Sequence, residues 1–338
     1  MAAEALEITV GDRVVRISHP GKVLFPEPGL TKEDLVRYYI AVGDGMLRAI
    51  GGRPTALRRY PDGVDGEFFF QKRAPKGAPP WVETVQIRFP SGRAADEICP
   101  TETAVLAWAA NLNAIEFHPW PVRRPDVDHP DELRIDLDPQ PGTTFRDAVA
   151  AARLAREVLD EAGCTAFAKT SGGRGVHLAV RIAAEWDFIE VRRAAIALAR
   201  ELARRQPSLV TADWWKEERG ERIFVDFNQA ARDRSMAAAY SARATPTATV
   251  SAPVSWDELD DAEPQDFTIV TMPERFARVE DPHAGMDKAV GRLDGLLEMS
   301  ATDQRDRGLG DMPYPPDYPK MPGEPMRVQP SRARPPAD

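Results

Sequence analysis

Two aspartates, Asp136 and Asp138, interrupt an otherwise apolar segment, RIDLDP, and their spacing could support metal chemistry. Side chains alternate along a strand, so both carboxylates face one side while Ile135 and Leu137 face the other. Two such charges repel unless a cation lies between them, and hard divalent cations such as Mg²⁺ and Mn²⁺ bind carboxylate oxygens. The alternative is a strand end with two solvated acids before Pro139. The pair alone leaves both interpretations open.

A glycine-rich turn, SGGRGVH, runs from Ser171 to His177. Glycines allow close backbone approach and can direct N–H groups at phosphate oxygens. Ser171 adds a hydroxyl, Arg174 a planar cation, and His177 a donor on the following segment. The motif is neither a P-loop nor a dinucleotide-binding fingerprint, because the Lys-Ser/Thr end is missing and no helix follows. Taken alone, a hairpin turn with a surface arginine and a core histidine is the simpler interpretation.

A third acid, Asp226, lies near the end of the apolar segment RIFVDF and indicates nothing by itself. The three acids and the glycine turn are informative about function only when they are taken together. Three carboxylates from two strands, with a phosphate-binding turn between them in the sequence, match the donor set of a two-metal phosphoryl-transfer site. In such sites the ions lie about 3.5–4 Å apart and stabilise the attacking and the leaving oxygen.

The elements that must position these residues alternate along the middle of the chain. We expect a strand over 132–139, a helix over 144–163, two strands joined by the glycine turn over 166–182, a helix over 188–205 and a strand over 222–227. Alternating strands and long helices predict a sheet layered with helices.

The flanking regions carry weaker signals. We expect a strand pair in the first thirty residues, a helix opened by an N-cap at Thr31, and a helix over about 101–113. A last helical stretch is expected at about 284–300. From residue 301 to 338 the chain is proline-rich and predicts an extended or disordered tail, whereas 1–300 forms the folded domain.

Composition excludes several classes of protein. The chain has 338 residues, 43% of them hydrophobic and 29% charged, as in an ordinary globular protein. No apolar run reaches the ~20 residues of a membrane span, and two cysteines cannot form a disulfide framework, so we expect a cytoplasmic protein with no membrane partner. Lys and Arg number 44 and Asp and Glu 53, a net charge of −9. That balance argues mildly against nucleic acid, although a local basic groove is compatible with it.

The ordered motifs resemble a known family. ISHPGKVLFPEPGLTKEDL, IDLDP, TSGGRGVHL, IFVDF and YSARATPTATVSAPVSWDEL are similar, in order and approximate spacing, to motifs of the polymerase domain of bacterial DNA ligase D and of stand-alone Prim-PolC-type proteins. These proteins belong to the archaeo-eukaryotic primase superfamily, and the resemblance covers roughly residues 10–295. It implies an α+β primase-polymerase fold, with mixed sheets and flanking helices in two lobes around a metal cleft.

The resemblance also implies roles for individual residues. Two ions, Mn²⁺ or Mg²⁺, would be held by the catalytic carboxylates Asp136, Asp138 and Asp226. The incoming NTP or dNTP would be bound by Ser171, Arg174, His177, His118, Arg219 and Arg243. DNA would be bound by Lys22 and Lys32 at a 5′-phosphate and by Phe69 and Phe70 against template bases.

Several of these residues have simpler interpretations. Lys22 and Lys32 are ordinary surface lysines without the resemblance, and His118 is of a type that is more often structural. Phe69 and Phe70 belong to a run that starts at Phe68, of which we expect at least one ring to face the core.

The sequence departs from the family at two positions. Arg174 stands where the family often has Lys, which keeps the charge but changes its geometry, and Ala230 stands where Asn is frequent.

The implied activity is a primase-polymerase that fills short gaps or processes ends bearing a 5′-phosphate, with ribonucleotides preferred. The process would be excision repair or non-homologous end joining. No Lys-x-Asp-Gly adenylation motif is present, so a separate ATP-dependent DNA ligase is the expected partner. Two rivals remain: a DNA-end binding or bridging module with vestigial catalysis, and a metal-dependent phosphoesterase.

Overall fold

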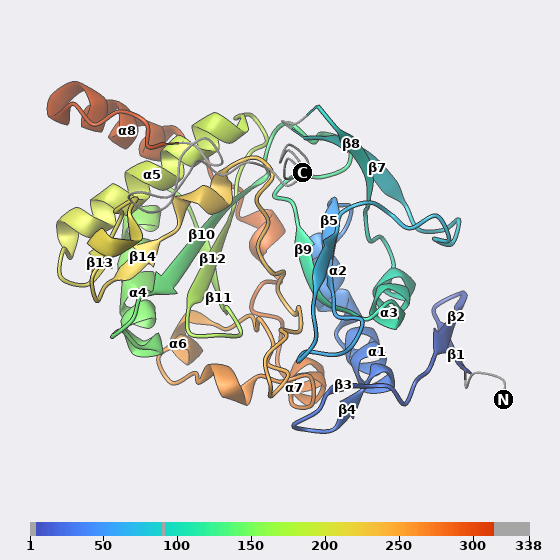
Figure 1. The fold of residues 1–338 in the computed structure, drawn as a ribbon. Coiled ribbons are helices and arrows are strands. Elements are labelled where there is room, and N and C mark those ends of the chain that lie inside the picture. Colours follow the sequence, from blue (N-terminus) through green and yellow to red (C-terminus); the bar gives the residue numbers. More distant parts are fainter. Residues whose placement is uncertain (1–4, 90–91, 314–338) are drawn as a thin grey trace, which may run out of the picture.

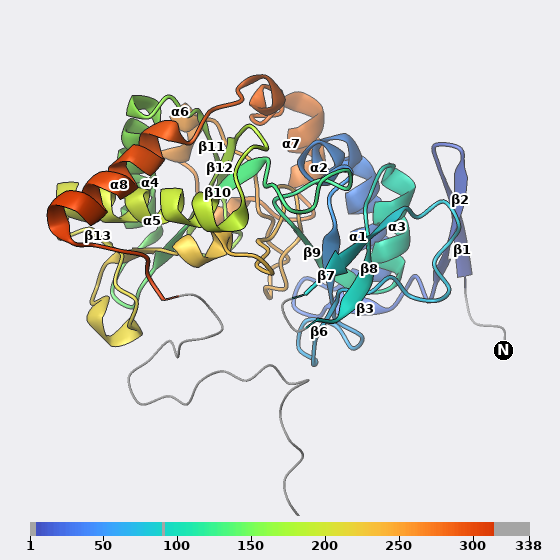
Figure 2. The ribbon, with the colours of Figure 1, turned by 90° about the horizontal axis from the view of Figure 1, so that it is seen from above.

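The computed structural model describes residues 5–89 and 92–313, which form two lobes side by side (Figures 1 and 2). Each lobe is built on its own sheet with helices against it. All strand pairs in these two sheets are antiparallel except β13–β14, which is parallel. The expected α+β class with two lobes is confirmed.

The sheet of the second lobe has β10 at its centre. Its strands, in spatial order, are β11 (Ala166–Thr170), β12 (Val176–Arg181), β10 (Glu132–Pro139), β14 (Ile223–Val225) and β13 (Val210–Thr211). The inner strands carry Leu, Ile and Val in the core, as a sheet covered by helices requires. The predicted strands at 132–139 and 222–227 and the glycine turn between β11 and β12 are therefore present.

Two long helices pack on this sheet. α4 (Phe145–Glu161) begins at the N-cap Thr144, and α5 (Phe188–Arg205) begins at Asp187; both N-termini form capping boxes. Their buried faces are rich in alanine, which lets the helices lie close to each other and to the strands. Both helices lie where the apolar periodicity predicts them.

The C-terminal helix differs from expectation. α8 (Asp294–Arg307) packs against α5 and continues past residue 300, and Gly308 ends it in the left-handed conformation at φ +67°. Residues 308–313 then return along α5. The predicted start of a structureless tail at residue 301 is therefore wrong, because apolar side chains of α8, including the buried Leu296, hold the helix against the core. Residues 314–338 lie outside the described part of the chain.

The first lobe carries the second sheet and a helical layer. Its strands are β6 (Phe69–Gln71), β5 (Thr55–Arg59), β8 (Ala94–Ile98) and β7 (Thr84–Arg88), with β9 (Ala114–Pro119) paired to β5. The helices are α1 (Lys32–Ala41), α2 (Gly43–Ile50) and α3 (Thr103–Asn111). Thr31 caps α1 in a capping box with Asp34, which confirms the predicted helix start. Two hairpins precede it, β1 (Ala5–Val10) with β2 (Arg13–Ser18) and β3 (Val23–Phe25) with β4 (Leu30–Thr31).

Short elements occupy the remaining chain. They are η1 (Lys216–Glu218), η2 (Phe227–Ala230), α6 (Trp256–Leu259), η3 (Pro264–Asp266), α7 (Met272–Arg278) and η4 (Met286–Lys288). Within the described residues, no helix is both long and apolar enough to cross a bilayer.

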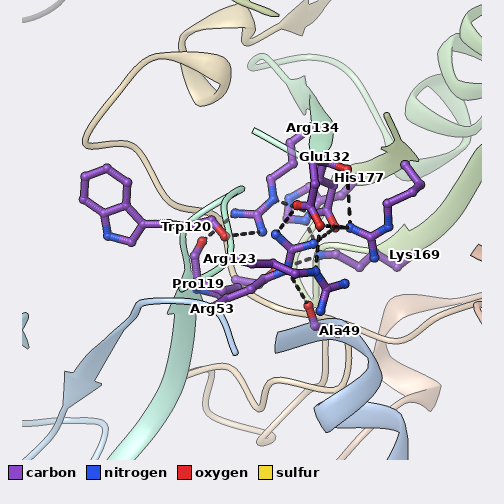
Figure 3. A network of polar contacts seen from close by, with 12 residues as sticks. Ala49, Arg53, Pro119, Trp120, Arg123, Glu132, Arg134, Lys169 and His177 are labelled. Carbon is purple, nitrogen blue, oxygen red and sulfur yellow. Dashed lines mark hydrogen bonds and ion pairs between the residues drawn. The ribbon is translucent and has the colours of Figure 1, made fainter. Parts of the chain in front are cut away.

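A buried ion network joins the lobes at the start of β10 (Figure 3). Arg53, fully buried after α2, contacts Asp131 at 2.5 Å and Glu132 at 3.3 Å. Arg134 on β10 contacts Glu132 at 2.6 Å, and Arg181 on β12 contacts both acids. Burial opposes ionisation of Glu132, but the charges of Arg134, Arg53 and Arg181 hold its pKa far below the usual range. The network thus ties the first lobe to two strands of the second.

Candidate active site

The three predicted carboxylates lie on neighbouring strands. Asp136 is half-buried and Asp138 exposed on β10, while Asp226 directly follows β14. The Asp226 amide donates to the Asp136 carbonyl at 2.9 Å, which places the third acid beside the first. Burial raises the pKa of Asp138, as do the charges of Asp136 and Asp226, against a hydrogen bond from Gln140 that lowers it. The three carboxylates are therefore close enough for the charges of Asp136 and Asp226 to act on Asp138.

The carboxylates are oriented by local partners. Gln140 donates to Asp138 Oδ2 at 3.2 Å. The Asn228 amide donates to Asp226 Oδ1 and the Gln229 side chain to Oδ2, each at 3.1 Å. Asp226 is thus the N-cap of η2, and its carboxylate position depends on that turn.

The donor chemistry fits hard divalent cations. In the described ranges, no set of three or more His, Cys, Asp and Glu side chains stands close enough to enclose an ion unaided. Mg²⁺ in nucleotide sites needs only one or two carboxylates, because waters and substrate phosphates supply the other ligands. The mutual repulsion that raises the pKa of Asp138 is relieved by a cation, so carboxylate oxygens on these strands suit such an ion.

The glycine turn is rigid and faces the carboxylate strand. Gly172 has φ +73°, a conformation that L side chains rarely adopt, and a Cβ on Gly175 would lie 2.7 Å from the Leu137 carbonyl. The Gly173 and Gly175 amides both donate to Ser171 Oγ at 3.1 Å, so these two amides are not directed at a phosphate as the sequence suggests. Ser171 keeps its own O–H as a donor.

His177 sits next to the first aspartate. Its Nε2 is 3.4 Å from Asp136 Oδ1, and its Nδ1 is 2.5 Å from the Lys169 ammonium, which also donates to Ser251 and to a backbone carbonyl. Burial, followed by the charge of Lys169, holds the pKa of His177 well below its usual value. Burial also lowers the pKa of Lys169 well below its usual value, and Nε2 of His177 faces Asp136. Sequence reasoning missed Lys169, whose side chain Figure 3 shows beside His177.

Glu116 is a second residue that sequence reasoning missed. It is buried on β9, where its Oε2 contacts His118 Nε2 at 2.8 Å and Arg243 Nε at 3.6 Å, and its Oε1 contacts Arg58 at 3.0 Å. Burial opposes its ionisation, but the hydrogen bond with His118 and the charges of Arg243, His118 and Arg58 lower its pKa to about 2. Burial also lowers the pKa of His118.

The three predicted phosphate-binding arginines border the same region. Arg243 donates to the Ser171 carbonyl at 3.0 Å and so connects the Glu116 cluster to the glycine turn. Arg219 stacks on Phe224 at 3.4 Å and is attracted by Asp226 and Asp138, although burial is the largest influence and lowers its pKa. Arg174 is exposed and donates to the Pro139 carbonyl at 3.3 Å. Arg219 thus interacts electrostatically with two of the carboxylates, Asp138 and Asp226.

The two predicted phosphate lysines line one open pocket of about 540 Å³ in the first lobe, together with His19, Gly21 and Asn113. Lys32 is nearly buried, and its ammonium donates to the Ser18 carbonyl at 2.8 Å. Burial, then the charges of Lys22 and Arg59, lower the pKa of Lys32 to about 8. Lys22 donates to the Pro61 carbonyl and lies 3.7 Å from Asp62. The pocket therefore concentrates positive charge.

The phenylalanine run lies on the surface. Phe68, Phe69 and Phe70 are 47%, 45% and 47% exposed, so the expectation that one ring faces the core is wrong. The rings pack on local cations and aromatics instead: Arg58 lies 3.8 Å above the Phe68 ring, and Phe70 meets His118 edge-on at 5.2 Å. The β5–β6 region thus presents three exposed aromatic rings.

The fold and the site define a class of protein: a nucleotidyltransferase of the primase-polymerase type. The family of the LigD primase-polymerase domain matches residues 31–283, and the chain belongs to that family, whose domains are metal-dependent.

Several relatives share this sequence. The chain is 34% identical over 298 residues to the multifunctional non-homologous end joining protein LigD of Pseudomonas aeruginosa, covering 88% of this chain and 35% of that protein. It is 32% identical over 311 residues to LigD of Mycolicibacterium smegmatis, covering 90% and 40%. The bifunctional LigD of Bacillus subtilis is 32% identical over 259 residues, covering 76% and 41%. The chain thus spans only about two fifths or less of these relatives.

A solved structure agrees with the fold. The polymerase domain of Mycobacterium tuberculosis Ligase D in complex with DNA superposes with a TM-score of 0.75 at 31% identity. The match covers 83% of this chain and 98% of that domain. The resemblance inferred from the sequence motifs is confirmed.

Proposed function

We propose that this protein is a DNA-dependent primase-polymerase that adds nucleotides, with ribonucleotides preferred, to a primer at short gaps or ends bearing a 5′-phosphate. The observation that carries the proposal is the joint placement of three carboxylates, the glycine turn and Arg219 around one site, with a separate lysine-lined pocket in the other lobe.

The catalytic residues have distinct roles in this proposal. Asp136 and Asp138 would hold two ions, Mg²⁺ or Mn²⁺, and Asp226 would hold the one nearer the primer. When bound, two such ions stabilise the attacking and the leaving oxygens. His177, whose Nε2 lies 3.4 Å from Asp136 Oδ1, would help to orient that carboxylate.

The triphosphate is bound by charge and hydrogen bonds. Its roughly four negative charges would be offset by Arg219, Arg243 and Arg174, because fixed cations stabilise the charge that develops during transfer. Ser171 donates its hydroxyl hydrogen, and His118, held by Glu116, lies beside the exposed Phe70 ring. Arg219 and Arg243 are largely buried, and a charge there is more effective than in water.

The DNA is bound by the first lobe. Lys22 and Lys32 would grip the downstream 5′-phosphate, a dianion suited to two neighbouring ammonium groups. Phe69 and Phe70, exposed on the β5–β6 hairpin, would stack on template bases. The biological process would be excision repair or non-homologous end joining, with sealing by a separate ATP-dependent DNA ligase.

Primer extension tests the proposal. The substrate is a duplex with a gap of a few nucleotides and a 5′-phosphate, with Mn²⁺ or Mg²⁺ and either ribo- or deoxynucleotides. Template-directed addition that is lost in Asp136→Asn and Asp138→Asn, with DNA binding retained, supports the polymerase. Binding without extension in the wild type favours an end-binding module. Release of nucleotides in the absence of added triphosphate favours a phosphoesterase.

A further inference from the structure

A segment beyond the family match is tied to α5 by three arginines. We call residues 308–313 the C-terminal strap. Arg200 donates to the carbonyls of Leu309 and Gly310 at 3.3 and 2.8 Å, and Arg193 pairs with Asp311 at 2.7 Å. Arg192 donates to the carbonyls of Met312 and Pro313 at 3.1 and 2.5 Å. Each residue of the strap from 309 to 313 is therefore bound by an arginine of α5.

Arg192 differs from the other two arginines because it faces inward. It is 3% exposed, and its guanidinium lies 5.3 Å from the Phe227 ring. The same Nη2 that binds Pro313 donates to Asn228 Oδ1 at 3.2 Å. One buried side chain thus contacts both the strap and η2.

Asn228 completes the connection to the active site. Its backbone amide donates to Asp226 Oδ1 at 3.1 Å, in the turn for which Asp226 is the N-cap. A guanidinium fork is planar and fixes its partners in direction as well as distance. Displacing Arg192 would release the Asn228 side chain and let η2 rotate, which would turn the Asp226 carboxylate.

We propose that the C-terminal strap positions Asp226 through Arg192 and Asn228, so that Arg192 is a positioning residue for divalent-cation binding. The inference rests on the proposed role of Asp226 as a metal ligand. Neither the strap nor α8 falls within residues 31–283, to which the family match extends. Metal affinity in this chain would then depend on a segment outside the matched domain.

The test measures the Kd of Mn²⁺ for the full chain by isothermal titration calorimetry, without DNA or nucleotide. Arg192→Met and Asn228→Ala are each expected to weaken Mn²⁺ binding by about tenfold, as loss of a group that orients a metal ligand does. The double variant is expected to lose no more than either single variant, because both break one relay. Arg193→Met, which removes only the exposed pair with Asp311, is the control and should bind within about twofold of the wild type.

Other results overturn the proposal. Binding within twofold of the wild type in both single variants shows that the strap does not act on Asp226, and losses that multiply in the double variant show that the two residues act separately. Circular dichroism checks folding, and if Arg192→Met is unfolded, Asn228→Ala decides alone. Unchanged Mn²⁺ binding in Asp136→Asn refutes the proposed metal site itself, a failure separate from that of the relay.

Discussion

Glu116 shows how much of this site depends on a residue that makes no contact with solvent. One carboxylate holds His118, Arg243 and Arg58, which lead respectively to the Phe70 ring, the glycine turn and the Phe68 ring. The cluster joins the candidate template surface to the candidate triphosphate site.

We expect Glu116→Gln to raise KM for the nucleotide by about tenfold with a smaller change in kcat. The substitution keeps the shape but weakens charge-assisted hydrogen bonds, each worth about 1.5–3 kcal/mol. Steady-state primer extension measures the split. Glu67→Gln, on an exposed residue of the same hairpin region, is the matched control, and an equal effect of both would contradict the assignment.

Lys32 gives a pH prediction. Its pKa is lowered to about 8, so the free protein loses this positive charge as the pH rises through 8. The preference for 5′-phosphorylated over 5′-hydroxyl DNA should therefore fall between pH 7 and 9, measured as the ratio of Kd values by fluorescence anisotropy. Lys32→Met should give a low ratio with little pH dependence. A ratio that stays constant in the wild type would exclude Lys32 from the phosphate site.

At the scale of elements, the glycine turn between β11 and β12 has a left-handed residue, Gly172, next to Arg243 of the candidate site. We expect Gly172→Ala to lower the free energy of unfolding by about 1–3 kcal/mol, because φ +73° is unfavourable for alanine. Its methyl group would also meet the Arg243 side chain and the Val250 backbone, so extension activity should fall. Gly77→Ala, which would meet nothing within 4 Å, is the control in urea denaturation and in primer extension.

Local patterns predicted the elements well and their partners poorly. The helix at Thr31, the strand around Asp136 and the glycine turn follow from capping and apolar periodicity, which act over a few residues. Lys169 and Glu116 were missed although His177 and His118 lie near them in the sequence, because their other partners, Ser251 and Arg243, come from far along the chain. A lysine in an apolar strand such as AFAKT was the available signal.

The phenylalanine run shows the opposite error. Apolar residues are expected inside, yet Phe68, Phe69 and Phe70 are held on the surface by a short hairpin whose cations cover their faces. The sequence carried the signal in the neighbouring Arg58 and Arg59, which the composition alone could not connect to the rings.

At the scale of the whole molecule, the buried ion network is one of the links between the lobes. Arg53→Met should lower the free energy of unfolding by about 3 kcal/mol, because it leaves Asp131 and Glu132 buried with fewer cations. Arg37→Met, which removes an exposed pair within α1, should change it by less than about 0.5 kcal/mol. Guanidinium denaturation of both variants measures the difference, and equal effects would mean that water screens the network.

The two proposed DNA-binding sites lie on opposite sides of that link. The lysine pocket belongs to the first lobe and the carboxylates to the second, and Arg53, Arg134 and Arg181 hold the lobes in one relation. Under the proposed function, the buried charges would fix the distance between these two sites, and that distance would limit how many nucleotides separate a primer end from a bound 5′-phosphate. On a longer gap the protein would have to release either the primer end or the 5′-phosphate. Product lengths on substrates with graded gap lengths therefore measure this limit.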